Sequence, residues 1–287
     1  MNILTFDVED WFHILDNPET KDEKHWMNFE SRIHQNMDRI FSQLEKHNQK
    51  ATFFSIGWVA RKYPDIIKKI DSLGYEIATH SDMHQLAYEF NKEEFKQDLE
   101  MSVKSIEDIT GKKVRAYRAP GFSVMKQNKW VFEELIKNGI EIDSSVFPAA
   151  RAHGGFEEFG SAEPAYIEVD GCRIKEFPIN IYPVFGKNII FSGGGYFRLI
   201  PYPLMKYFMN HSDYVMSYLH PRDFDANQPM IEGLSLFRKF KSYVGLKNSL
   251  NKLDRLINDF HFIDLEEADN LVDWSTAKVI KLNDGVL

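Results

Sequence analysis

The stretch GYEIATHSDMH, residues 74–84, places two histidines directly after a short apolar segment. Residues 75–79 have the length and composition of a β-strand, and His80 and His84 follow them. Two imidazoles four residues apart can share one face of a helical turn and offer two nitrogens to one divalent metal ion. The carboxyl ends of strands are also where α/β folds place their active sites. The alternative is that both histidines lie on the surface at the start of a helix.

Segments with strand character alternate with segments of helical periodicity over the first 150 residues. The expected strands cover residues 2–6, 51–56, 75–79, 114–117 and 140–142. The expected helices cover residues 31–46, 59–73, 92–109 and 128–138. This alternation predicts a parallel sheet with right-handed crossovers, either closed into a barrel or doubly wound.

The middle of the chain has a different pattern. Two strand-like segments flank Asp170 and Gly171, a pair typical of a tight β-hairpin turn. We therefore expect a β-rich insertion over about residues 150–195, followed by a strand at residues 214–219 that runs into His220.

The last part of the sequence, about residues 230–287, predicts a C-terminal helical extension. No linker, repeat or low-complexity segment divides the chain. We therefore expect residues 1–287 to form a single domain.

The composition argues against several classes of function. The 287 residues include 35 basic and 43 acidic side chains, a net charge of −8, which argues against a nucleic-acid-binding surface. The single cysteine, Cys172, excludes an intrachain disulfide and a thiolate metal cage. We expect no signal peptide before the first strand, and no apolar run approaches the roughly 20 residues that span a bilayer. We expect a cytoplasmic protein without a transmembrane segment, and the sequence leaves its oligomeric state open.

Polar residues follow most of the expected strands, at the ends that converge on one face of a wound α/β domain. They are Asp7, Glu9 and Asp10 after the first strand, His80 and His84 after the third, Arg118 after the fourth, Asp143 after the fifth, and His220 after the strand at residues 214–219. Each alone has an ordinary structural explanation, such as a helix cap, an ion pair or a buried histidine. Their joint occurrence at successive strand ends favours a catalytic site.

These residue types match the needs of metal-assisted hydrolysis of an amide or ester. Two histidines and a carboxylate suit Zn²⁺ and leave coordination positions open for water and substrate. A second carboxylate can accept a proton from the attacking water, and a separate histidine can protonate a leaving amine. An arginine can hold the catalytic carboxylate ionised.

The motifs resemble those of the polysaccharide deacetylase family, the NodB-homology carbohydrate esterases, over about residues 2–225. The matching segments, in the family's order, are TFDVED at 5–10, HSDMH at 80–84, RAPG at 118–121, Asp143, and Leu219 with His220. The resemblance implies an α/β fold, a distorted (β/α) barrel of seven parallel strands, with the hairpin as an insertion.

The resemblance also implies roles for individual residues. Asp7 would be the general base, paired with Arg118, and His220 would be the general acid. Asp143 would orient His220, and the backbone N–H of Gly121 would bind the oxyanion.

The resemblance makes His80 and His84 metal ligands, with Zn²⁺ as the expected ion. The third ligand is Glu9 or Asp10. The sequence leaves this choice open because Asp-Val-Glu-Asp replaces the adjacent Asp-Asp pair usual in the family.

The implied activity is removal of an N-acetyl group from an amino sugar. Residues 193–198 and 220–225 resemble a subgroup found with bacterial exopolysaccharide and O-antigen assembly genes, which implies a sugar precursor or oligosaccharide as substrate. Two alternatives remain open: hydrolysis of a non-sugar C–N bond, and an inactive relative that only binds glycan or metal.

Overall fold

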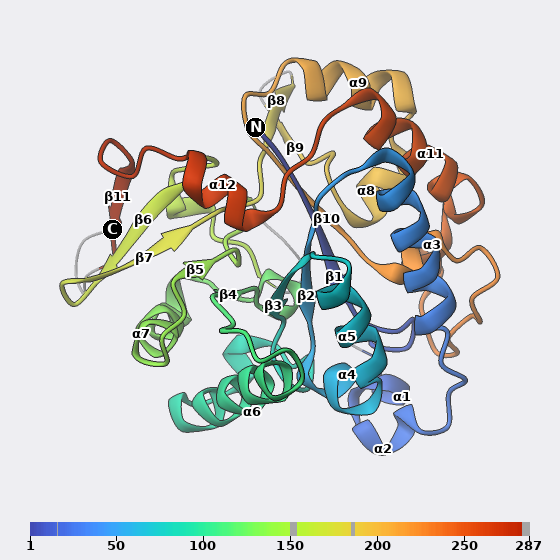
Figure 1. Ribbon diagram of the computed structural model, residues 1–287, viewed down its shortest axis with the longest axis horizontal. Coiled ribbons are helices and arrows are strands. Elements are labelled where there is room, and N and C mark those ends of the chain that lie inside the picture. Colours follow the sequence, from blue (N-terminus) through green and yellow to red (C-terminus); the bar gives the residue numbers. More distant parts are fainter. Residues whose placement is uncertain (16, 150–153, 185–186, 283–287) are drawn as a thin grey trace.

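A mostly parallel nine-stranded sheet forms the centre of the computed structural model, which describes residues 1–15, 17–149, 154–184 and 187–282 (Figure 1). Parts of the expected insertion (150–153 and 185–186) and of the expected extension (283–287) lie outside the described residues. The strand order is β10-β1-β2-β3-β4-β5-β7-β6-β11. The strands are β1 Asn2–Val8, β2 Thr52–Ser55, β3 Glu76–Thr79, β4 Ala116–Tyr117, β5 Ile142–Asp143, β6 Ala165–Val169, β7 Cys172–Glu176, β10 Val215–Leu219 and β11 Lys278–Lys281.

Seven of these strands run parallel, from β10 through β1 to β5 and on to β7, which confirms the expected distorted (β/α) barrel. Strand β6 is antiparallel to β7, and β11 pairs in parallel with β6. Among the described residues, β10 and β11 are the edges of the sheet, so the barrel is open between them.

The predicted hairpin is present, but it belongs to the central sheet. Asp170 and Gly171 both adopt positive φ angles, 49° and 79°, as a tight hairpin turn requires. Strand β7 pairs with β5, so this hairpin extends the barrel. The C-terminal region, expected to be helical, likewise contributes β11 to the sheet. Both pairings satisfy backbone groups that an exposed edge would leave open.

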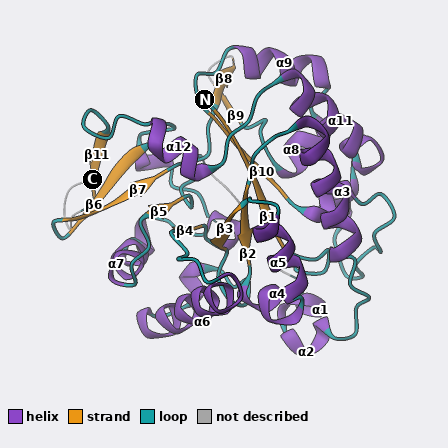
Figure 2. Ribbon diagram, viewed as in Figure 1, coloured by secondary structure: helices purple, strands orange, loops and turns teal. Residues whose placement is uncertain are grey.

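Helices surround the strands (Figure 2). They are α1 Pro18–Lys21, α2 Glu23–Trp26, α3 Ile33–His47, α4 Gly57–Lys62, α5 Pro64–Ser72, α6 Lys92–Thr110, α7 Trp130–Lys137, α8 Gly194–Leu199, α9 Tyr202–Asn210, α10 Leu236–Tyr243, α11 Leu246–Asp259 and α12 Leu265–Leu271. A separate two-stranded sheet pairs β8, Tyr182–Val184, with β9, Lys187–Ile189. Within the described ranges, none of the helices combines the length and apolarity needed to cross a bilayer.

The parallel register brings distant polar residues to one end of the barrel. Phe6 of β1 pairs with Leu219 of β10, and Thr79 of β3 pairs with Tyr117 of β4. Because the next residue in each strand direction is polar, these pairings place Asp7, His80, Arg118 and His220 at the same carboxyl-terminal edge.

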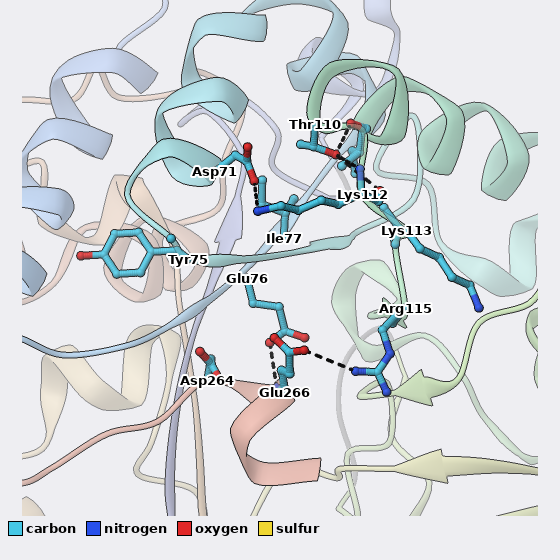
Figure 3. A pocket seen from close by; sticks show the side chains of 13 residues that line it. Asp71, Tyr75, Glu76, Ile77, Thr110, Lys112, Lys113, Arg115, Asp264 and Glu266 are labelled. Carbon is cyan, nitrogen blue, oxygen red and sulfur yellow. Dashed lines mark hydrogen bonds and ion pairs between the residues drawn. The ribbon is translucent and has the colours of Figure 1, made fainter. Parts of the chain in front are cut away.

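A pocket of about 340 Å³ lies at the opposite, amino-terminal ends of β3 and β4, against the start of α12 (Figure 3). Its basic side chains pair with acids: Lys112 lies 2.6 Å from Asp71, and Lys113 lies 2.7 Å from Glu141. The carboxylate of Glu76 accepts hydrogen bonds from the backbone N–H groups of Leu265 and Glu266, both at 3.0 Å. The charged side chains around this pocket therefore pair with one another, and Glu76 links the start of α12 to β3.

The position of Glu76 predicts a pH dependence of stability. Burial raises the pKa of Glu76 to about 7, above the ordinary value of 4.5 for a glutamate, so folding takes up a proton between these two pH values. The contribution of protonated Glu76 to the free energy of unfolding is fully present below about pH 4.5 and is lost as the pH rises through 7. Since the residue is partly exposed, its contribution is at most about 3 kcal/mol. Urea unfolding at pH 5 and pH 8 should show a smaller loss of stability for Glu76→Gln than for the native chain; an equal loss would refute this origin.

Candidate active site

Four side chains, three of them buried, meet at the carboxyl-terminal edge of the barrel. Asp7 Oδ1 lies 2.7 Å from Arg118 Nη1, and Asp7 Oδ2 lies 3.8 Å from His220 Nε2 and 4.0 Å from His80 Nε2. Asp7, Arg118 and His80 are at most 2% exposed, and His220 is the more accessible member of the group. The structure therefore brings together Asp7, Arg118, His80 and His220, as the sequence predicted.

Glu9, His80 and His84 form a group that could hold a metal ion. Each offers one ligand atom, and these atoms all lie within 4.8 Å of one another. Nδ1 of His80 is hydrogen bonded to the backbone carbonyl of Arg118 at 2.7 Å, which fixes the tautomer and leaves Nε2 to face the site. His84 Nε2 lies 2.7 Å from Glu9 Oε2. One carboxylate and two imidazoles form a donor set that suits Zn²⁺ and similar ions.

The segment that carries the two histidines is a loop, so the expectation of a helical turn is wrong. Ser81 and His84 adopt left-handed φ angles of 71° and 53°, which no helix contains. Asp98 of α6 holds the loop by accepting hydrogen bonds from the backbone N–H groups of Asp82 and Met83. Left-handed non-glycine residues are costly, and they persist where surrounding contacts enforce them.

Asp10 and Glu9 point in different directions. The oxygens of Asp10 accept hydrogen bonds from the hydroxyl of Ser31 and from the backbone N–H groups of Trp11 and Arg32, at 2.5, 2.8 and 3.1 Å. These partners lie next to Asp10 in the chain or just before α3. Of the two acids left open by the sequence, only Glu9 therefore faces the histidines.

The guanidinium of Arg118 donates hydrogen bonds to several surrounding polar groups. Nη1 donates to Asp7 and to the hydroxyl of Thr5, both at 2.7 Å, and Nη2 donates to the hydroxyl of Ser144 at 3.0 Å. The guanidinium carbon lies 4.1 Å from the ring centroid of Phe54. Burial favours the neutral form of Asp7, but the charge of Arg118, supported by the nearby histidines, outweighs it and keeps the pKa of Asp7 below its usual value.

The structure does not bring Asp143 to His220. The oxygens of Asp143 accept hydrogen bonds from the backbone N–H and the hydroxyl of Ser145, and its carboxyl group also bonds to that of Glu176. Instead, Asp223 Oδ2 lies 3.0 Å from His220 Nδ1. The expectation that Asp143 orients His220 is therefore wrong.

Asp223 was missed in the sequence although a local signal was present. The backbone N–H of His220 donates to Asp223 Oδ2 at 2.9 Å, so the acid caps the short 3₁₀ helix Pro221–Phe224 as well as contacting the imidazole. A proline followed two residues later by an acid is a common start of a helical turn. That pattern, directly after a candidate catalytic histidine, could have identified Asp223.

Asp223 is itself held by a buried arginine. Arg198 Nε lies 3.1 Å from Asp223 Oδ1, and both side chains are at most 5% exposed. Burial lowers the pKa of His220, but its hydrogen bond to Asp223 and the charges of Glu9, Asp223 and Asp7 outweigh this effect and raise the pKa to about 9. These contacts therefore favour the imidazolium form of His220.

Two glycine segments shape the edges of the site. Gly121 adopts a left-handed φ of 62° and is partly exposed beside Arg118 in the chain. At Gly193, a Cβ would lie 2.3 Å from the ring of Tyr218, so only glycine allows this close approach to β10. Gly193 therefore serves packing against β10, the strand that His220 follows.

A pocket of about 400 Å³ opens beside His84. Its lining includes His13, Leu15, Lys21, Trp26 and His84. This pocket gives a ligand a place next to the candidate metal ligands, with an aromatic wall and a charged rim.

Two family models match adjoining parts of the chain. Residues 17–141 match polysaccharide deacetylase, and residues 144–270 match a domain of unknown function, DUF3473. A peptidoglycan-N-acetylglucosamine deacetylase of Bacillus cereus is 30% identical over 97 residues, which are 33% of this chain and 35% of that protein. A chitooligosaccharide deacetylase of Azorhizobium caulinodans is 35% identical over 78 residues, 27% of this chain and 37% of that protein. The chain thus spans little more than a third of these relatives.

Solved structures share the fold. A candidate polysaccharide deacetylase from Mycobacterium smegmatis has a TM-score of 0.66 at 17% identity, with coverage of 99% of this chain and 94% of that one. A CE4 family pseudoenzyme from Bacillus anthracis has a TM-score of 0.50 at 12% identity, with coverage of 93% and 64%. These identities show the fold alone. The family-model match shows that residues 17–141 carry a polysaccharide deacetylase domain.

Proposed function

We propose that this protein is a metal-dependent hydrolase that removes an N-acetyl group from an amino sugar. The observation that carries the proposal is the position of Asp7, between the Arg118 guanidinium and the imidazoles of His80 and His220. The polysaccharide deacetylase domain supports carbohydrate deacetylation as the reaction class.

Glu9, His80 and His84 would hold the metal ion, with Zn²⁺ as the expected ion and Co²⁺, Ni²⁺ or Fe²⁺ as alternatives. When bound, such an ion supplies Lewis-acid chemistry and lowers the pKa of a water molecule. The hydrogen bond from His80 Nδ1 to the Arg118 carbonyl aims the imidazole toward this site.

Asp7 would accept the proton of the attacking water. A general base must be ionised, and Arg118 keeps Asp7 in that form despite its burial. Arg118 also fixes the carboxylate orientation, since the Nη1 hydrogen bond engages Oδ1 and leaves Oδ2 facing the histidines.

His220 would protonate the departing amine. Its Nε2 faces Asp7 and Glu9 at 3.8 Å, while Asp223 holds Nδ1 on the opposite side of the ring. Because the carboxylate of Asp223 favours the imidazolium, His220 enters the reaction with the proton that it must deliver. The backbone N–H of Gly121 is the proposed donor to the developing oxyanion.

The substrate proposed from the resemblance is a sugar precursor or oligosaccharide of bacterial surface-polysaccharide biosynthesis. The expected cytoplasmic location stays a prediction. The pocket beside His84, with Trp26 in its wall, supports a sugar ligand, since aromatic faces pack well against apolar ligand surfaces. The alternative of a lost activity is disfavoured because Asp7, Arg118, His220 and Asp223 are all in contact positions.

The first test is acetate release from a panel of acetamido sugars, with and without a chelator. We expect turnover that the chelator abolishes and added metal restores. Asp7→Asn and His220→Ala should each lower kcat by about 10²–10⁴-fold, the usual size of general acid–base catalysis. Full activity in either folded variant would remove the assigned role, and acetate-free turnover of a cyclic amide would favour the non-sugar alternative.

The second test separates Glu9 from Asp10. Glu9→Gln should lower the bound metal measured by elemental analysis, because it removes the only carboxylate of the donor set. Asp10→Asn, a matched change at the adjacent position, should retain the metal and lower the thermal midpoint, because it weakens the contacts to Ser31 and Arg32. Loss of metal only in the Asp10 variant would reverse the assignment.

The third test separates Asp223 from Asp143. Activity that needs protonated His220 falls as the pH rises through its pKa, so the alkaline limb of kcat/KM reports this group. Asp223→Asn removes the carboxylate that favours the imidazolium and should move this limb to lower pH by about one unit or more. Asp143→Asn should leave the limb in place, and equal shifts in both variants would contradict the assignment.

A further inference from the structure

Helix α10, Leu236–Tyr243, exposes an apolar face that the rest of the described chain leaves uncovered. Leu236 is 87% exposed, Phe237 65% and Phe240 55%, and no residue of this helix is buried. Three large apolar side chains next to one another on a helix cost solvation free energy unless a partner covers them. The face therefore calls for an occupant outside the described residues.

Lysines flank this apolar face on both sides. Successive helix residues are about 100° apart, so Leu236, Phe240 and Phe237 form one continuous stripe, with Lys239 and Lys241 at its two edges. Lys241 Nζ lies 4.4 Å from the ring centroid of Phe237. Long basic side chains beside an apolar stripe can reach an anionic surface while the stripe enters an apolar layer.

The opposite face of α10 binds the protein. Arg238 Nη2 donates to the carbonyl of Leu15 at 2.7 Å, and the carbonyl of Ser242 accepts from Arg198 Nη1 at 2.8 Å. The helix is therefore held in place with its apolar stripe turned outward.

The charge around α10 is opposite to that of the whole chain. Residues 233–253 contain five basic residues and no acidic residue, whereas the complete chain has a net charge of −8. An anionic partner is favoured at this segment and repelled by much of the remaining chain. Charge and apolarity together fit a bilayer with anionic headgroups better than they fit a folded protein of neutral surface.

The helix also contacts the segment that lines the candidate active-site pocket. Leu15, the acceptor of the Arg238 hydrogen bond, lines the pocket beside His84. Asn17 Nδ2 donates to the carbonyl of Glu232, just before α10, at 3.1 Å. A surface that binds α10 would therefore lie near the pocket.

We propose that α10 docks this protein on a membrane surface that contains anionic lipid. Leu236, Phe237 and Phe240 enter the interfacial layer, and Lys239 and Lys241 contact lipid phosphates. This binding does not depend on the proposed catalytic function. If both hold, docking brings the pocket close to glycans carried on lipid.

Vesicle flotation tests the proposal without any turnover measurement. The full chain is mixed with vesicles of phosphatidylcholine alone, or of equal parts phosphatidylcholine and phosphatidylglycerol. We expect flotation with the anionic vesicles that weakens as salt is raised. Lys239→Gln/Lys241→Gln should weaken this binding on the order of tenfold or more, because each lysine near an anionic surface contributes. Phe237→Ser/Phe240→Ser should weaken it at least as strongly.

Leu204→Ser/Leu271→Ser is the matched control, since it removes two exposed apolar side chains from α9 and α12. The control should float like the native chain. The proposal is overturned if the native chain stays in the aqueous fraction with anionic vesicles, or if the control loses as much binding as the α10 variants. It is also overturned if sedimentation without lipid shows a dimer that Phe237→Ser/Phe240→Ser dissociates, because the face would then bind a second copy.

Discussion

The buried ion pair between Arg118 and Asp7 is the constraint on which the site depends. Neither side chain has appreciable contact with solvent, so each charge is tolerated only because the other is present. Removing one partner of such a pair typically costs about 3–5 kcal/mol, since the other is left buried and uncompensated. The pair also crosses the barrel, because Asp7 belongs to β1 and Arg118 follows β4.

Arg118 acts on the site through its backbone as well as its side chain. Its side chain orients Asp7 and reaches Ser144 after β5, while its carbonyl oxygen fixes the ring of His80. A single residue therefore positions the proposed base and one proposed metal ligand. The left-handed residues of the 80–84 loop are tolerated in this setting because Asp98 satisfies the backbone donors that the loop leaves open.

The sequence predicted which strand ends carry the site, but it predicted side-chain directions less well. The alternation of strand-like and helical segments was sufficient to predict the parallel barrel, because each strand forms a local unit with the helix that follows it. The hairpin turn at Asp170 and Gly171 was also local, whereas the pairing of β7 with β5 is a tertiary contact that no short motif encodes.

The choice between Glu9 and Asp10 could have been made from strand geometry. Side chains alternate along a strand, so continuing the period of β1 past Val8 predicts Glu9 on the side of Asp7 and Asp10 on the side of Val8. Predicting the position of Asp223 needed different reasoning, because its side chain both caps a short 3₁₀ helix and contacts the imidazole of His220. Family resemblance directed attention to Asp143, which packs instead beside Glu176 beneath the same arginine.

The candidate active site combines residues from two segments that match different family models and from a first segment that neither model covers. The polysaccharide deacetylase match, residues 17–141, contains both histidines of the candidate metal site and Arg118. Asp7 of β1 and Glu9 just after β1 precede it, and His220 and Asp223 lie in the adjoining matched segment, residues 144–270. The proposed proton-transfer groups thus lie outside the segment that matches the polysaccharide deacetylase model. Arg198 and α10 lie in that second domain too, so the same region positions the proposed acid and carries the exposed apolar helix. What distinguishes this chain from the deacetylases it matches is therefore to be sought in residues 144–270.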